Sequence, residues 1–152
     1  MRVRHTVSAV VFCGLATGAM ASEIAPGDVN IVEGVVEAPL TDKAGDPEAG
    51  RAIFANRKQG NCLACHMVTE LLDSEQFHGE VGPPLDGVAD VYSAGELRAR
   101  IVNPKTELPD TIMPSFYRVG GTNRTGEKFA GKTILTAQQV EDVIAYLQTL
   151  KE

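Results

Sequence analysis

Cys62-Leu63-Ala64-Cys65-His66 is the stretch that decides the fold of this 152-residue chain. Two thiols three positions apart, followed directly by an imidazole, have the spacing of a covalent attachment site for c-type haem. The thiols add to the vinyl groups of the porphyrin, and the histidine is then placed to bind the iron as its proximal ligand. The sequence therefore predicts one covalently bound haem c, held by Cys62, Cys65 and His66.

Three other interpretations of this motif are less favoured. A structural zinc site needs about four nitrogen or sulfur ligands, and Cys13 is the one other cysteine of the sequence. A thioredoxin-like redox pair follows a strand, whereas the flanks here have the pattern of a helix and a Gly/Pro-rich loop. A disulfide between Cys62 and Cys65 would close a very short loop and stabilise little.

The first 21 residues have the pattern of a secretory signal peptide. Two arginines make a basic start, residues 7–16 form an apolar run, and Ala19-Met20-Ala21 is a small-x-small cleavage site. The run is shorter than the roughly 20 residues that span a bilayer. We therefore predict a signal peptide at 1–21, no membrane span, and export to the periplasm. Its removal also takes away Cys13 and leaves no thiol beside the haem-bound pair.

The remaining chain is acidic and suits one domain. Without the signal peptide it has 12 basic and 20 acidic residues, a formal net charge of −8. This charge argues against nucleic acid or an anionic membrane surface as a partner. We place the domain at 46–152, behind an extended N-terminal arm at 22–45.

The arm is predicted to be neither helical nor free. Its two prolines and three glycines argue against a helix, and its apolar residues are too many for a disordered tail. We expect it to lie against its own domain or to dock on a second protein, and the sequence leaves both open. The apolar residues are Val29, Ile31, Val32, Val35, Val36 and Leu40.

The domain is expected to begin with an amphipathic helix. Asp46 is a suitable N-cap, Pro47 suits the first helical position, and the helix is expected to run to about Lys58. Ile53 and Phe54 lie on its apolar stripe. Gly50, on the same side, would let another backbone approach closely.

Two further helices have capping boxes at their starts. The pattern of residues 93–96 begins a helix that ends before Pro104, and that of residues 136–139 begins a C-terminal helix whose apolar positions keep a 3.6-residue period to Leu150. The predicted helices thus lie before residue 60, between residues 93 and 103, and after residue 136. Two Pro-rich loops separate them, at residues 82–87 and 108–116.

One of these loops, Gly82-Pro83-Pro84-Leu85-Asp86-Gly87, follows the attachment motif. An ordinary surface turn is one interpretation. In a haem protein, however, the carbonyl of Pro83 would accept a hydrogen bond from the free ring nitrogen of His66, which fixes the tautomer and raises the basicity of the ligand.

The loop at residues 108–116 contains Met113, the candidate sixth ligand of the iron. A lone methionine is more often core filler than a ligand. Here two of the four methionines leave with the signal peptide, and Met67 adjoins His66 on the proximal side. Met113 is therefore preferred and His78 is the alternative. A thioether ligand favours ferrous iron and raises the reduction potential of the haem. The site is therefore suited to accepting and passing on an electron.

The order of these features resembles class I cytochrome c over about residues 46–152. The resemblance implies an all-α fold, three to five helices packed around one covalently bound haem, with the extended arm as an addition. It also implies that Cys62 and Cys65 bear the haem and that His66 and Met113 are its axial ligands. The first helix, through Gly50 and Phe54, would then cross Tyr146 of the last at near right angles.

A closer resemblance is to the family of small mono-haem X subunits of periplasmic sulfur-oxidising (Sox) cytochrome complexes. It covers most of the mature chain and rests on residues 60–66, 82–87, 113–118 and 135–147. It implies a heterodimer with a larger haem-bearing subunit of the same complex, which oxidatively couples thiosulfate to a cysteine of a carrier protein, an L-cysteine S-thiosulfotransferase activity. This chain would take up the released electrons and pass them to a soluble cytochrome, and its apolar arm would be a docking strip for the larger subunit.

No residue of this chain is predicted to be catalytic. Apart from the haem ligands, the mature chain has one further histidine, no further cysteine and no obvious carboxylate pair. Two other functions remain open: a free-standing periplasmic electron-carrier cytochrome c, and a haem sensor or gas-binding module in which the methionine ligand dissociates.

Overall fold

The computed structural model describes residues 22–120 and 126–152. The predicted signal peptide, residues 1–21, lies outside the described residues, and so does Arg124 of the loop before the last helix. The described chain is helical, as predicted. Its helices are α1 (Pro47–Ala55), α2 (Val88–Val91), α3 (Ala94–Val102) and α4 (Ala137–Leu147), and short 3₁₀ turns lie between them. None of its helices has the length and apolar character needed to cross a membrane.

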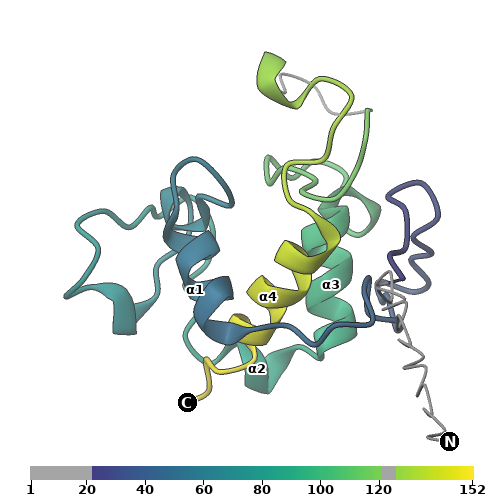
Figure 1. Ribbon diagram of the computed structural model, residues 1–152. Helices are drawn as coiled ribbons and strands as arrows, with labels where there is room; N and C mark the ends of the chain where they lie inside the picture. The colour runs from purple at the N-terminus through teal and green to yellow at the C-terminus, as the bar shows by residue number, and fades with distance from the viewer. Residues whose placement is uncertain (1–21, 121–125) are drawn as a thin grey trace, which may run out of the picture.

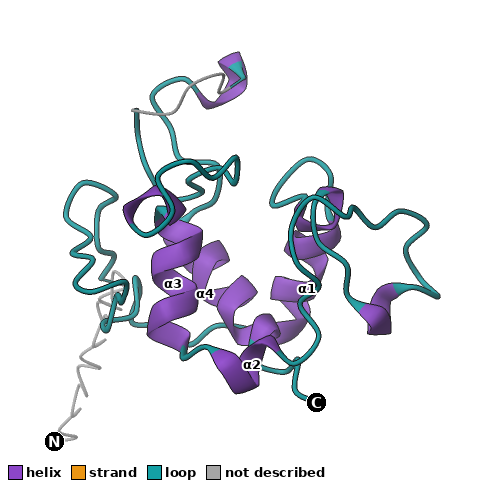
Figure 2. Ribbon diagram, turned by 180° about the vertical axis from the view of Figure 1, so that it is seen from behind, coloured by secondary structure: helices purple, strands orange, loops and turns teal. Residues whose placement is uncertain are grey.

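Helix α4 is the centre of the fold. It lies between α1 and α3 in both views; the first part of the arm lies beyond α3, and its last residues run back past α4 to α1 (Figures 1 and 2). Its apolar stripe is buried at Val140, Val143, Ile144 and Leu147. The helix ends at Leu147, before the end of the predicted apolar period, yet Leu150 is still buried because the turn that follows packs it on the core.

Helix α1 begins as predicted and ends earlier. The Asp46 side chain accepts hydrogen bonds from the first-turn amides of Glu48 and Ala49. The helix was expected to reach about Lys58, but it ends at Ala55. The reason is Asn56, whose side-chain oxygen accepts the Lys58 N–H at 2.9 Å and closes a turn that competes with the helix.

Helices α1 and α4 cross in direct backbone contact. A Cβ at Gly50 would collide with the carbonyl oxygen of Asp142, so only glycine permits this approach. One turn further on, the rings of Phe54 and Tyr146 meet edge to face, with centroids 5.4 Å apart. The close contact that the sequence predicted for Gly50 is confirmed.

Helix α3 has the predicted capping box, in which the Ser93 hydroxyl accepts the Glu96 N–H and the Glu96 carboxylate accepts the Ser93 N–H. It ends at Val102, before Pro104. The short helix α2 was not predicted from the sequence, because four residues are too few to display a helical period.

The N-terminal arm packs on its own domain, as the first of the two alternatives expected. Val36 and Leu40 are fully buried in the core. The Leu40 N–H donates to Glu141 of α4 at 2.9 Å, and Arg98 of α3 donates to the Val36 carbonyl at 2.7 Å. The idea of the arm as a docking strip is therefore wrong for its two most buried apolar residues, since the domain itself covers them.

Candidate functional site

The attachment motif forms a single tight turn directly after α1. Cys62–Ala64 is a 3₁₀ turn, and the Cys62 carbonyl accepts the N–H groups of both Cys65 and His66, at 3.0 and 2.9 Å. Both cysteines are free thiols and half-buried. Desolvation by burial raises the pKa of the Cys62 thiol to about 12.

His66 is fixed by the Pro-rich loop in the way the sequence predicted. Its Nδ1 lies 2.8 Å from the carbonyl oxygen of Pro83. Since a carbonyl only accepts, Nδ1 carries the proton, and Nε2 is left with its lone pair as the nitrogen that can bind a metal. A Cβ at Gly82 would fall 2.6 Å from Nδ1, so the glycine is required for the ring to lie here.

Backbone hydrogen bonds hold this loop against the attachment turn. The N–H groups of Gly79, Gly82 and Leu85 donate to the carbonyls of Leu63, Cys65 and Met67, at 2.8, 2.7 and 2.9 Å. This register sets the Pro83 carbonyl opposite the imidazole. The sequence indicated the turn but not its register, which depends on contacts between residues 16 to 18 positions apart.

A side-chain contact that we did not predict strengthens the same loop. The Asp86 carboxylate accepts the N–H and the hydroxyl of Thr69 at 2.9 and 3.0 Å. Asp86 is near the end of the Pro-rich motif, and a carboxylate at the end of a turn is a common cap for a neighbouring amide. The position of Asp86 in the Pro-rich motif was therefore the one sequence signal for its contact with Thr69.

Met113 lies in a loop that polar contacts hold in shape. Its N–H donates to the Thr111 hydroxyl at 3.2 Å, and Lys105 donates to the carbonyls of Thr111 and Met113 at 2.5 and 3.5 Å. The buried Ser115 hydroxyl donates to Asn103 at 2.8 Å. The half-buried Met113 side chain is therefore carried by a loop with a defined backbone path, and Lys105 is a second residue that sequence reasoning missed.

His78, the alternative sixth ligand, belongs to the proximal segment. Its Nδ1 accepts the N–H of Val68, two residues after His66, at 3.4 Å. Its Nε2 is buried and has no hydrogen-bond partner among the described residues. This contact ties the His78 ring to the segment that follows His66.

The two halves of the predicted site come from opposite sides of the molecule. The attachment turn extends from the end of α1, and the Met113 loop follows α3; both lie at the same end of the helical core, one on each side of it (Figures 1 and 2). A haem that is bound on both of its faces needs one ligand-bearing segment on each side.

The residues fit a covalently attached haem. They offer two thiols on one turn, an imidazole whose Nδ1 is bonded to a carbonyl and whose Nε2 is not, and a thioether on the loop across the core. A structural zinc site does not fit, because within residues 22–120 and 126–152 no three His, Cys, Asp or Glu side chains are grouped to hold a metal ion.

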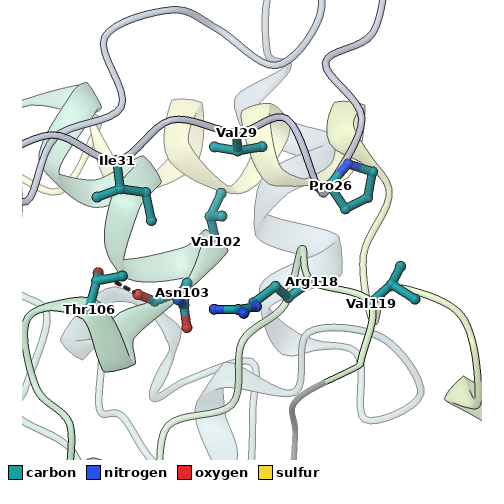
Figure 3. Close-up of a pocket in the computed structure, with 9 residues that line it drawn as sticks. Pro26, Val29, Ile31, Val102, Asn103, Thr106, Arg118 and Val119 are labelled. Carbon is teal, nitrogen blue, oxygen red and sulfur yellow. Dashed lines mark hydrogen bonds between the residues drawn. The ribbon is translucent and has the colours of Figure 1, made fainter.

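A cavity of about 400 Å³ lies elsewhere, between the arm and the end of α3 (Figure 3). None of the four predicted haem-binding residues lines it. Most of the side chains around it are apolar, and the guanidinium of Arg118 points in from the segment after the Met113 loop. The lining residues are Pro26, Gly27, Val29, Ile31, Val102, Asn103, Thr106, Arg118 and Val119.

Comparisons with known proteins show the family of this chain. The Cytochrome c family model matches residues 47–151. The crystal structure of SoxXA from P. pantotrophus contains a chain that is 45% identical, with a TM-score of 0.78, over 86% of this chain and 99% of that one. A search of curated sequences gave no significant match. The cofactor is covalently bound haem c, and the chain belongs to the cytochrome c family, in which it is related to a chain of SoxXA.

Proposed function

We propose that this chain is the mono-haem electron-transfer subunit of a heterodimeric thiosulfate-oxidising complex. The observation that carries the haem-binding part of the proposal is the His66–Pro83 hydrogen bond beside the two cysteines, because it leaves one imidazole nitrogen for iron. The 45% identity to a chain of SoxXA supports the assignment to such a complex.

In this proposal Cys62 and Cys65 would bear the haem through thioether bonds, and His66 and Met113 would hold its iron. The haem supplies a one-electron iron couple when it is bound. The chain's own residues set its properties: the Pro83 carbonyl raises the basicity of His66, and the loop from Lys105 to Ser115 presents the thioether.

The substrate chemistry belongs to the partner. Outside the haem-binding residues, this chain offers no cysteine in its described part and one histidine, whose ring is bonded to the backbone. We therefore assign the coupling of thiosulfate to a carrier-protein cysteine, an L-cysteine S-thiosulfotransferase reaction, to the larger haem-bearing subunit of the complex. This chain accepts the electrons and passes them to a soluble cytochrome in the periplasm.

The first experiment separates the complex from a free-standing carrier. The native protein is purified from the periplasm of its source cell, and its partners are identified by haem staining after native electrophoresis. Co-purification with a larger haem protein, and thiosulfate-dependent reduction of the haem of this chain only in its presence, supports the proposal. A monomer that is reduced without the partner is instead the free carrier.

The second experiment tests the ligands and the sensor alternative. The oxidised protein is expected to show the sulfur-to-iron charge-transfer band, and the reduced protein is expected not to bind carbon monoxide. Met113→Ala should lose the band and bind carbon monoxide, whereas His78→Ala, the matched control, should keep the band. Carbon monoxide binding by the unmodified protein would favour the sensor.

A further inference from the structure

The buried side chain of Tyr117 joins the Met113 loop to the N-terminal arm. Tyr117 follows Met113 by four residues and is 1% exposed. Its hydroxyl lies 2.9 Å from the Glu23 carboxylate and 2.7 Å from the carbonyl oxygen of Ile24. The first residues of the arm that the structure describes are thus in direct contact with the segment that leaves the ligand loop.

The arm that holds Tyr117 is itself held firmly. The Ile24 N–H donates to the Leu40 carbonyl at 2.9 Å, and Leu40 is fully buried. From there the contacts continue to the buried pair of Arg98 and Glu141, 2.7 Å apart. Glu23 and Ile24 are therefore a stationary support rather than a fraying end.

In the part of the chain that the structure describes, the middle of the arm makes no hydrogen bond to Tyr117. Between Ile24 and Val36 the arm forms one wall of the cavity of about 400 Å³, with Val29 and Ile31 facing Val102 across it (Figure 3). Val29 and Ile31 are partly buried and pack on the core. The hydrogen bonds from the ligand segment to the arm, within the described residues, are those of the Tyr117 hydroxyl.

The segment after Met113 is also attached at two other places, the end of α3 and the stretch before α4. The Phe116 N–H donates to the Ile101 carbonyl at 3.0 Å, and Ser115 donates to Asn103. The Phe116 carbonyl accepts the N–H groups of residues 134 and 135, both at 3.0 Å. The Tyr117 contact ties the segment to a third part of the chain, the N-terminal arm. A loop held from three directions has fewer ways to open than a loop held from two.

We propose that the N-terminal arm is a brace for the sixth ligand, in which Glu23 and Ile24 hold Tyr117 and thereby restrain the Met113 loop. Tyr117 is then a positioning residue for electron transfer, because the thioether stays on the iron only while the loop stays closed. This inference rests on the proposed role of Met113 as axial ligand.

The test is the rate at which cyanide replaces the methionine in the oxidised full-length holoprotein. Replacement requires the loop to open, so its rate reports the population of the open loop. Tyr117→Phe removes the hydroxyl and keeps the buried ring. It should accelerate replacement about three- to tenfold, which is the effect of losing one hydrogen bond. Glu23→Ala should act in the same direction, and Glu23→Gln, which keeps an acceptor oxygen, should restore most of the original rate.

The matched control is Tyr146→Phe. Tyr146 is also buried and also donates from its hydroxyl to a glutamate, Glu70, at 2.7 Å, but it lies at the crossing of α1 and α4. Tyr146→Phe should leave the rate at which cyanide replaces the methionine unchanged. Equal acceleration by both tyrosine variants, or none by Tyr117→Phe, would overturn the brace. If Met113 is not the ligand, the unmodified protein lacks the sulfur-to-iron band from the start, which distinguishes that failure from this one.

Discussion

His66 and Gly82 lie so close that a side chain at position 82 would occupy the space of the imidazole ring: a Cβ there would be 2.6 Å from Nδ1. The same nitrogen donates to the Pro83 carbonyl. The orientation of the proximal ligand thus depends on the absence of one methyl group.

Gly82→Ala should therefore displace the imidazole and weaken its hydrogen bond to Pro83. A less basic imidazole stabilises ferric iron less, so the reduction potential should rise; the strain should also lower the unfolding free energy by about 1–3 kcal/mol. A spectroelectrochemical titration measures the first effect and urea denaturation the second. Gly126→Ala is the control, since nothing lies within 4 Å of its Cβ; equal potentials in the two variants would contradict the prediction.

Gly50→Ala should separate α1 from α4. The added methyl group would meet the Asp142 carbonyl and lie 2.9 Å from the Tyr146 Cβ. The Asp142 carbonyl belongs to the backbone of α4 and cannot rotate away as a flexible side chain does. We therefore expect the unfolding free energy to fall by about 1–3 kcal/mol or more. Thermal denaturation followed by circular dichroism measures it. Gly27→Ala, with open space around its Cβ, should melt like the unmodified protein.

The buried pair of Arg98 and Glu141 should be costly to break. Glu141→Gln leaves the guanidinium buried without its counter-charge, and a loss of about 3–5 kcal/mol is expected. The arm should loosen as well, because Glu141 also accepts the Leu40 N–H. Hydrogen exchange at Leu40 and urea denaturation report both effects. Glu37→Gln removes the same charge from an exposed position of the arm and should change neither quantity.

Alkaline pH should destabilise the fold through its buried tyrosines. Burial, and then the hydrogen bond to Glu70, raise the pKa of Tyr146; burial and Glu23 do the same for the pKa of Tyr117. The unfolded chain titrates near pH 10. The folded protein holds these protons more tightly, so the stabilisation is fully present below about pH 10 and is lost as the pH rises towards the folded pKa values.

Urea midpoints between about pH 8 and 11 measure this loss. Tyr146→Phe should remove about half of the tyrosine contribution to the alkaline slope, since one of the two shifted tyrosines is then gone. A slope that stays the same in both single Phe variants would show that other groups cause it.

Much of the domain could be predicted because its signals are local. The caps at Asp46, Ser93 and Thr136 act on amides two or three residues away, and the attachment motif is contiguous. The turn at Pro83 was also predictable, since a haem-binding histidine needs an acceptor for its second nitrogen.

The other parts of the site depend on contacts between distant residues. Tyr117 meets Glu23 across 94 positions, and Leu40 meets Glu141 across 101. Nothing in the arm's composition distinguishes valines that face their own core from valines that face a partner. The arm's place was therefore undecidable from the sequence, and the end of α1 was misjudged because the Asn56 turn competes with a helix that the apolar pattern alone would have continued.

The Gly50–Asp142 contact also has a consequence for biogenesis. In the sequence, α1 lies near the start of the domain and α4 near its end. Helix α1 therefore lacks its partner until almost the entire polypeptide has been made. The thiols at positions 62 and 65 are made well before α4. A chain that lacks its last segment therefore cannot make the contact between α1 and α4, and the domain around the attachment turn closes only when that segment is in place.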